Sequence, residues 1–175
     1  AVVAGAGGHA GRQTPFALVT EIRTWFDGPL ILSGAIATGR ALLAARALGA
    51  DLGYIGSPFI ATTEASAPAD YKDMIVAGHA DDIVTTAVFT GVSGNYLKGS
   101  IERAGLDPAT LGERPAGAVS FEGAAGGPRA WRDIWGAGQG IGAVAAVVPV
   151  EELVARLARE YAEASATLQA RLAAG

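Results

Sequence analysis

One histidine near the start of the chain stands among glycines, in a setting that suits acid–base chemistry. His9 directly follows Gly7 and Gly8, which come after the apolar residues 1–4. Imidazole titrates near neutral pH, so it can take a proton from a substrate. The flanking glycines leave space around the ring for a ligand. The sequence therefore offers His9 as a candidate general base, with a hydrogen-bonded structural histidine as the alternative.

Two further glycine-containing corners could bind an anion. Ser33 and Gly34 form one, and Gly56 and Ser57 form the other. Backbone N–H groups at such corners, together with the serine hydroxyls, can point at a phosphate, and the helix that begins near Thr38 would add the positive end of its dipole. The alternative is that each corner is only a tight turn. Because the two corners follow successive predicted strands, we expect them to share one anion.

Short apolar strands and helices must position these corners. Residues 1–4, 30–32 and 52–55 have the composition of buried strands. Residues 14–26 and 40–48 between them have helical spacing, with Thr14 and Pro15 at one helix start and Gly49 after the other helix. This alternation predicts a parallel α/β fold. In (β/α)₈ barrels, phosphate binds after the last two strands.

The alternation stops after residue 62. The pattern predicts helices over residues 64–76, 95–104 and 150–172, an extended piece over 81–89 and a long loop over 106–129. The expected division is residues 1–62 as three βα units, 63–128 as a smaller, mostly helical segment with loops, and 129–175 as C-terminal helices that pack back on the first part.

Several aromatic and amide residues in these later segments have two interpretations. Trp131 and Trp135 are four residues apart, which predicts a shared helix face in the core. Asn95 and Tyr96 follow a glycine-rich turn and could cover a pocket or anchor a loop. Gln139, between two glycines, could contact a ligand or stabilise a turn.

Composition excludes several classes of function. The 175 residues carry a net charge of −4 with no basic cluster, which argues against a nucleic-acid partner and against binding to an anionic membrane surface. The chain has no cysteine, so disulfides and cysteine nucleophiles are excluded and a cytoplasmic location is favoured.

Three familiar site motifs receive little support from the sequence. His9 and His79 are too far apart for a zinc-binding helix motif, so no metal is predicted. No G-x-S-x-G nucleophile motif occurs. The glycines of residues 136–142 only weakly match a dinucleotide-binding loop, because no clear strand precedes them.

Taken together, these segments resemble the nitronate monooxygenases, formerly called 2-nitropropane dioxygenases. The segments that carry the resemblance are AGGHAG at residues 6–11, PFALV at 15–19, SGAIATG at 33–39, LGAD at 48–51 and IGSPFIAT at 55–62. Further matching segments are YKDMIV at 71–76, FTGV at 89–92, GNYLK at 94–98 and DIWGAGQG at 133–140.

The resemblance implies the C-terminal part of an FMN-dependent TIM barrel, whose activity is oxidation of alkyl nitronates by O₂ to carbonyl compounds and nitrite. His9 matches the family's catalytic histidine, which removes the α-proton or positions the nitronate. By the same comparison, the expected FMN contacts are Gly7, Gly8, Ser33, Gly34, Ala35, Tyr54, Ile55, Gly56 and Ser57. Ala35 stands where many members have glycine, and Tyr54 where many have glutamine.

The resemblance also implies that the N-terminal half of the barrel is missing, because the three strands would be the last three of eight. A sheet of three parallel strands exposes an edge and a face. We therefore expect a longer natural protein, and weak FMN binding and little catalysis from this chain alone. The alternatives are a flavin-dependent enoyl-thioester reductase and a non-catalytic fragment of such a barrel.

Overall fold

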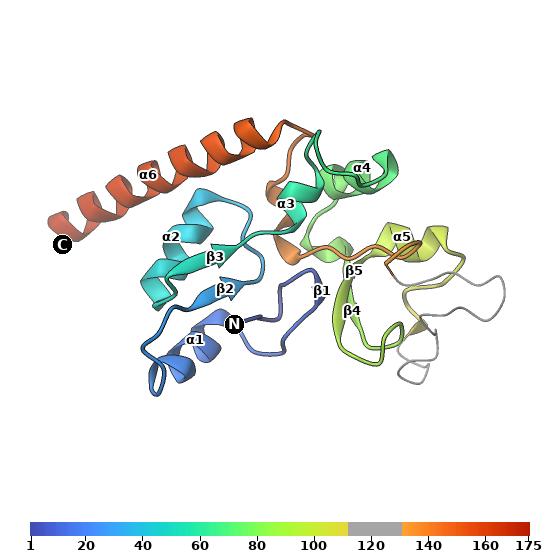
Figure 1. Cartoon of the computed structure of the whole chain (residues 1–175), viewed down its shortest axis with the longest axis horizontal. Helices are drawn as coiled ribbons and strands as arrows, with labels where there is room; N and C mark the ends of the chain where they lie inside the picture. The colour runs from blue at the N-terminus through green and yellow to red at the C-terminus, as the bar shows by residue number, and fades with distance from the viewer. Residues whose placement is uncertain (112–130) are drawn as a thin grey trace.

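The computed structural model of the chain describes residues 1–111 and 131–175, and its first part contains a small parallel sheet (Figure 1). Strand β2 (Ile31–Ser33) pairs in parallel with β3 (Leu52–Tyr54), with Ile31 opposite Leu52. Val2 forms a parallel bridge with Ser33 on the other side of β2. The predicted parallel alignment of the first three extended segments is confirmed.

Two helices connect these segments as the capping residues predict. Helix α1 (Pro15–Arg23) starts at Thr14, whose hydroxyl accepts a hydrogen bond from the Ala17 N–H. Helix α2 (Gly39–Leu48) starts at Thr38 in the same way and ends at Gly49, which has a φ of 109°. Glycine suits that left-handed position because it has no Cβ.

The two faces of the parallel sheet differ sharply in burial. Val3 and Leu32 are 2% exposed and pack with α1 and α2 in one apolar cluster. The register and the alternation of side chains place Ile31, Leu52 and Tyr54 on the opposite face. Their exposed fractions are 45%, 57% and 66%. An apolar sheet face is therefore left uncovered by the described residues.

A second, antiparallel sheet lies beside the first (Figure 1). Its strand order is β1 (Gly8–His9), β5 (Gly94–Leu97) and β4 (Ile83–Thr86). The prediction of a helix from residue 95 is wrong over 95–97, because all three residues pair with β4 and Asn95 also pairs with β1. The helical part, α5 (Lys98–Arg103), begins only after β5.

The other elements are mostly short. They are α3 (Ser57–Ile60), α4 (Ala69–Ala77), η1 (Ala80–Asp82), η3 (Gln139–Ala143) and the long helix α6 (Val150–Ala174). The predicted helix over 64–76 begins only after Pro68. Trp131 lies in a turn and Trp135 in an irregular segment, so the two do not share a helix face. Most of the predicted loop, residues 112–129, lies outside the described residues. Within the described ranges, no helix has the length and apolar character that a membrane crossing requires.

Helix α6 packs along α2 through a close backbone approach (Figure 1). A Cβ at Gly39 would lie 2.2 Å from the Tyr161 nitrogen and 2.3 Å from the Leu157 oxygen, so glycine is required for this contact. Glu160 of α6 accepts a hydrogen bond of 2.8 Å from the Gly39 N–H. This carboxylate complements the positive end of the α2 dipole.

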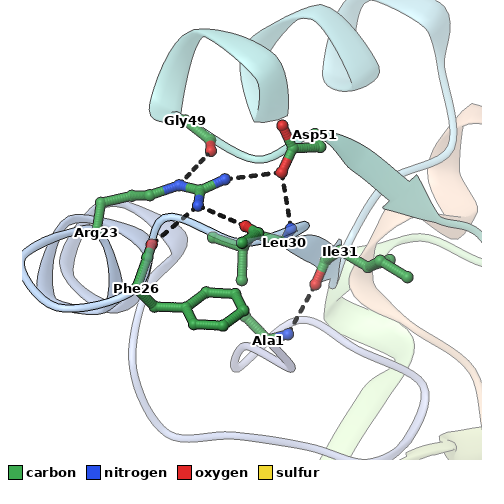
Figure 2. A network of polar contacts seen from close by, with 8 residues as sticks. Ala1, Arg23, Phe26, Leu30, Ile31, Gly49 and Asp51 are labelled. Carbon is green, nitrogen blue, oxygen red and sulfur yellow. Dashed lines mark hydrogen bonds and ion pairs between the residues drawn. The ribbon is translucent and has the colours of Figure 1, made fainter.

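Arg23 links α1 to the parallel sheet through hydrogen bonds (Figure 2). Its guanidinium donates to the Gly49 carbonyl at 2.8 Å and to Asp51 Oδ2 at 2.8 Å. It also donates to the carbonyls of Phe26 and Gly28. The same Asp51 oxygen accepts from the Leu30 N–H at 2.7 Å. One carboxylate thus fixes the residues just before β2 and β3.

Replacing Asp51 with Asn should make the stability of the chain less dependent on pH. The Leu30 N–H and then Arg23 hold the pKa of Asp51 below its ordinary value of about 3.8. A lowered folded-state pKa stabilises the fold above the unfolded pKa, and this stabilisation is lost as pH falls. The denaturant midpoint of D51N should therefore lie below that of the wild type at pH 7, and the gap should close below about pH 4.

Asp27 supplies the matched control for this prediction. It is exposed and lies in the loop between α1 and β2. D27N removes a carboxylate of the same type from an exposed position. It should therefore leave the denaturant midpoint unchanged at pH 7 and below about pH 4. A D51N gap of constant size from pH 7 to pH 3 would show that the carboxylate charge is not involved.

Candidate functional site

A cavity of about 250 Å³ lies where the parallel segments end. The residue pairs Ser33–Gly34 and Gly56–Ser57 lie at the carboxyl ends of β2 and β3 and line the cavity together. The lining residues are Ala6, Gly7, Gly8, Ser33, Gly34, Ala35, Ile36, Ala37, Tyr54, Gly56, Ser57, Pro58, Ile60, Tyr71, Trp131, Gly136, Gly138 and Gly140. This is the edge at which parallel α/β folds place their ligand sites.

The structure brings together all of the predicted cofactor contacts except one. Gly7, Gly8, Ser33, Gly34, Ala35, Tyr54, Gly56 and Ser57 all line the cavity. Ile55 does not, and instead packs against the apolar cluster beneath the sheet. The strand alternation explains this difference, because Ile55 points to the opposite face from Tyr54.

Backbone strain gathers at this cavity. Within the described residues, Ala35 and Trp131 are the two non-glycine residues with positive φ, at 54° and 69°. Both line the cavity. A left-handed conformation costs such a residue roughly 1–2 kcal/mol. Strained conformations of this kind concentrate at functional sites.

Neutral groups supply the hydrogen-bond donors of the cavity. The first hydrogen bond within helix α3 runs from the Phe59 N–H to the Gly56 carbonyl. The N–H groups of Gly56 and Ser57 come before it and therefore have no partner within the helix. Ser57 Oγ accepts from the Gly138 N–H at 2.9 Å, so its proton remains available for donation. No lysine or arginine is among the described lining residues.

Two of the expected anion-binding groups already have partners in the protein. The Ala35 N–H donates to the Gly5 carbonyl at 3.1 Å, so Ala35 shapes the wall rather than offering a donor. The N-terminus of α2 holds the carboxylate of Glu160, where the sequence suggested a phosphate. The N–H groups at the start of α3 and the serine hydroxyls remain available to an anion in the cavity.

A run of glycines passes directly behind the histidine corner. A Cβ at Gly136 would lie 3.1 Å from the Gly8 nitrogen, and one at Gly138 would lie 2.8 Å from the Gly5 oxygen. A Cβ at Gly140 would lie 2.7 Å from the Ala35 oxygen. These glycines allow close packing of two backbone segments. Gly136 and Gly138 precede the 3₁₀ helix η3 and Gly140 lies within it, so they do not join a strand to an α-helix.

Two aromatic side chains that sequence reasoning did not assign to the site complete its walls. Tyr71 lines the cavity, stacks on Trp135 with ring centroids 4.7 Å apart and donates a hydrogen bond to the Gly136 carbonyl. Burial raises the pKa of Tyr71 to about 12. Trp131 also lines the cavity, although spacing placed it in the core. No local signal in the sequence identifies either residue as part of the site.

His9 is exposed and is not among the residues that line the cavity, although its neighbours Gly8 and Trp131 are. Its ring meets the Trp131 ring edge to face, with centroids 5.5 Å apart. Its Nε2 lies 3.1 Å from Thr90 Oγ1. The imidazole is thus accessible to a ligand while two neighbours limit its rotation.

Asn95 anchors the histidine segment from below. It is fully buried, and its Nδ2 donates to the carbonyls of Ala4 and Ala6 at 2.7 Å each. Of the two predicted roles, the structure shows the loop anchor. The neighbouring Tyr96 is also fully buried, and its hydroxyl has no hydrogen-bond partner of ordinary geometry within the described residues. Burial raises the pKa of Tyr96, and the nearby Thr90 hydroxyl lowers it by less.

Comparison with known sequences gives a consistent match. The family model described as nitronate monooxygenase matches residues 2–160. A protein of Paraburkholderia phytofirmans named nitronate monooxygenase is 30% identical over 171 residues, which cover 89% of this chain and 46% of that protein. The chain thus spans about half the length of this relative.

Two solved structures match nearly all of this chain and about half of their own length. FabK from Thermotoga maritima has a TM-score of 0.74 and 28% identity, over 97% of this chain and 55% of that one. A nitroalkane oxidase from Streptomyces ansochromogenes has a TM-score of 0.70 and 28% identity, over 96% of this chain and 52% of that one.

Proposed function

Because the chain belongs to the nitronate monooxygenase family, we propose that it forms the cofactor-binding and catalytic part of an FMN-dependent enzyme that oxidises alkyl nitronates. The products would be a carbonyl compound and nitrite, with O₂ as the oxidant. The observation that carries this proposal is the shared cavity, in which both corners after parallel strands meet beside His9.

The residues present fit a flavin phosphate held by neutral donors. The first turn of α3 offers the N–H groups of Gly56 and Ser57, and a Cβ at Gly56 would meet no heavy atom within 4 Å. Open space beside unpaired backbone donors is what a bound phosphate requires. The Ser33 and Ser57 hydroxyls complete the set, and Tyr54 and Trp131 provide flat apolar surface.

The chain's own groups would bind a nitronate, and would deprotonate a substrate that enters as the neutral nitroalkane. A bound flavin would accept electrons from the substrate and pass them to O₂. His9, exposed beside the lining residues Gly8 and Trp131, would take the α-proton of a nitroalkane substrate or hold the nitronate by a hydrogen bond. The Trp131 ring beside it would limit access of water to that proton.

The uncovered sheet face supports a barrel that other strands would complete. Ile31, Leu52 and Tyr54 would lie inside a closed barrel, where side chains from alternate strands fill the interior. The matched relative is about twice as long as the aligned part of this chain. We therefore expect the remaining strands from outside these residues, and weak flavin binding without them.

The structural match to FabK favours one alternative, a flavin-dependent enoyl-thioester reductase. That reaction would consume a reduced nicotinamide and would release no nitrite. The two functions share the cavity and differ in the electron donor, so the geometry of this chain alone supports both. The family match favours the nitronate reaction.

One assay separates the two functions. The longest natural polypeptide that contains this sequence should be loaded with FMN and given either an alkyl nitronate with O₂ or an enoyl thioester with NADH or NADPH. We expect oxygen uptake with release of nitrite in the first mixture and no nicotinamide oxidation in the second. Thioester-dependent nicotinamide oxidation without nitrite would assign the reductase activity instead.

A further inference from the structure

We propose that Thr90 is a positioning residue that fixes the tautomer of His9 by accepting a hydrogen bond from its Nε2–H. This inference rests on the proposed function, in which His9 acts as a base. The His9 Nε2 atom lies 3.1 Å from Thr90 Oγ1, and the two residues are 81 positions apart in the sequence. Strand pairing of His9 with Gly94 brings them together.

The hydrogen bonds around Thr90 decide where its single hydroxyl proton lies. Thr90 Oγ1 is 3.0 Å from the Val92 carbonyl oxygen, which can only accept. The same oxygen lies 3.3 Å from the Val92 nitrogen, whose N–H can only donate. A threonine hydroxyl has one proton to give and two lone pairs to accept with.

Only one arrangement satisfies all three contacts. If the hydroxyl donated to His9, the Val92 carbonyl and Thr90 Oγ1 would face each other without a proton between them. If it donates to Val92, the oxygen accepts from both the Val92 N–H and the His9 Nε2–H. Every lone pair and proton of the hydroxyl is then used.

The consequence for chemistry is that Nδ1 carries the free lone pair of neutral His9. In neutral imidazole one nitrogen is a donor and the other an acceptor, so a donor at Nε2 leaves Nδ1 as the atom that can take a proton. Fixing a histidine tautomer through the other ring nitrogen is how carboxylate or carbonyl groups orient catalytic imidazoles elsewhere. Here a hydroxyl in the turn after β4 would do it.

The direct test is ¹⁵N NMR of the imidazoles in the full chain, at a pH where both histidines are neutral. His9 and His79 are its two histidines, so H79N assigns the signals. We expect protonated Nε2 and unprotonated Nδ1 for His9. In T90V, the ratio of the Nε2-protonated to the Nδ1-protonated tautomer should fall about tenfold, the factor expected for loss of one neutral hydrogen bond. In T90S this ratio should equal that of the wild type, because serine keeps the hydroxyl.

The wild-type spectrum is decisive even if T90V fails to fold. A proton on Nδ1 with a bare Nε2 would overturn the proposal, as would an unchanged ratio in a folded T90V. T86V is the control, because the Thr86 hydroxyl on β4 accepts from the Val88 N–H and does not contact His9.

Kinetics of the longest natural polypeptide separate this proposal from the proposed function. In T90V we expect kcat to fall about tenfold with KM and the flavin Kd unchanged, and in T90S a value near that of the wild type. If T90V changes the tautomer ratio while H9A keeps full activity, the hydrogen bond between Thr90 and His9 is confirmed and His9 has no catalytic role. An unchanged kcat in T90V with a shifted ratio would overturn the positioning role.

Discussion

Replacing His9 with Ala should lower kcat/KM for a nitroalkane substrate by about 10² to 10⁴, the range expected for loss of a general base. The flavin Kd should stay close to that of the wild type, because His9 is not among the residues that line the cavity. Nitrite release and flavin absorbance, measured on the longest natural polypeptide, report the two quantities separately.

His79 provides the matched control for H9A. It is exposed and caps the short helix η1, a position that asparagine also suits. H79N should therefore keep both activity and flavin content. Equal activity of H9A and wild type would remove His9 from the reaction, and a loss of folding in H9A would assign the residue a structural role.

Enlarging Gly56 should weaken flavin binding without weakening the fold. A Cβ at this position would meet no heavy atom within 4 Å, and the φ of −114° is ordinary for any residue. The new side chain would occupy space at the first turn of α3 that we assign to the phosphate. A side chain that overlaps the phosphate should cost about 1–3 kcal/mol of flavin binding free energy. The flavin Kd of G56A or G56L should therefore rise by about 10-fold to 10²-fold.

Gly99 on α5 gives the control for this substitution. A Cβ there would lie 3.4 Å from Met74 Sδ, an ordinary contact, and Gly99 does not line the cavity. G99A should leave the flavin Kd unchanged. Equal flavin affinity of G56L and wild type would show that the phosphate does not lie against α3, whatever the denaturant midpoints of the variants.

Local patterns were sufficient to predict the part of the fold that forms the cavity. Thr14 and Thr38 cap the two helices and Gly49 ends the second, as the residue types indicate. The apolar segments align in parallel, and their glycine corners meet at one edge. The caps depend on residues within one helical turn, and the parallel alignment follows from the repeated order of strand and helix, which is why the pattern could predict both.

The features that depend on distant partners could not be predicted in the same way. Asn95 was assigned to a helix because its strand partner, Gly8, is far away in the sequence. Glu160 occupies the N-terminus of α2 from another helix, and no local pattern predicts that contact. Trp131 reaches the cavity because its backbone adopts a φ of 69°, which helical spacing did not predict.

A crystal structure of the FMN complex, obtained with the longest natural polypeptide that contains this sequence, would show where the flavin phosphate binds. We expect the phosphate to accept hydrogen bonds from the Gly56 and Ser57 N–H groups, with the ring system reaching toward Gly7, Gly8 and His9. A phosphate bound away from the ends of β2 and β3 would contradict this expectation.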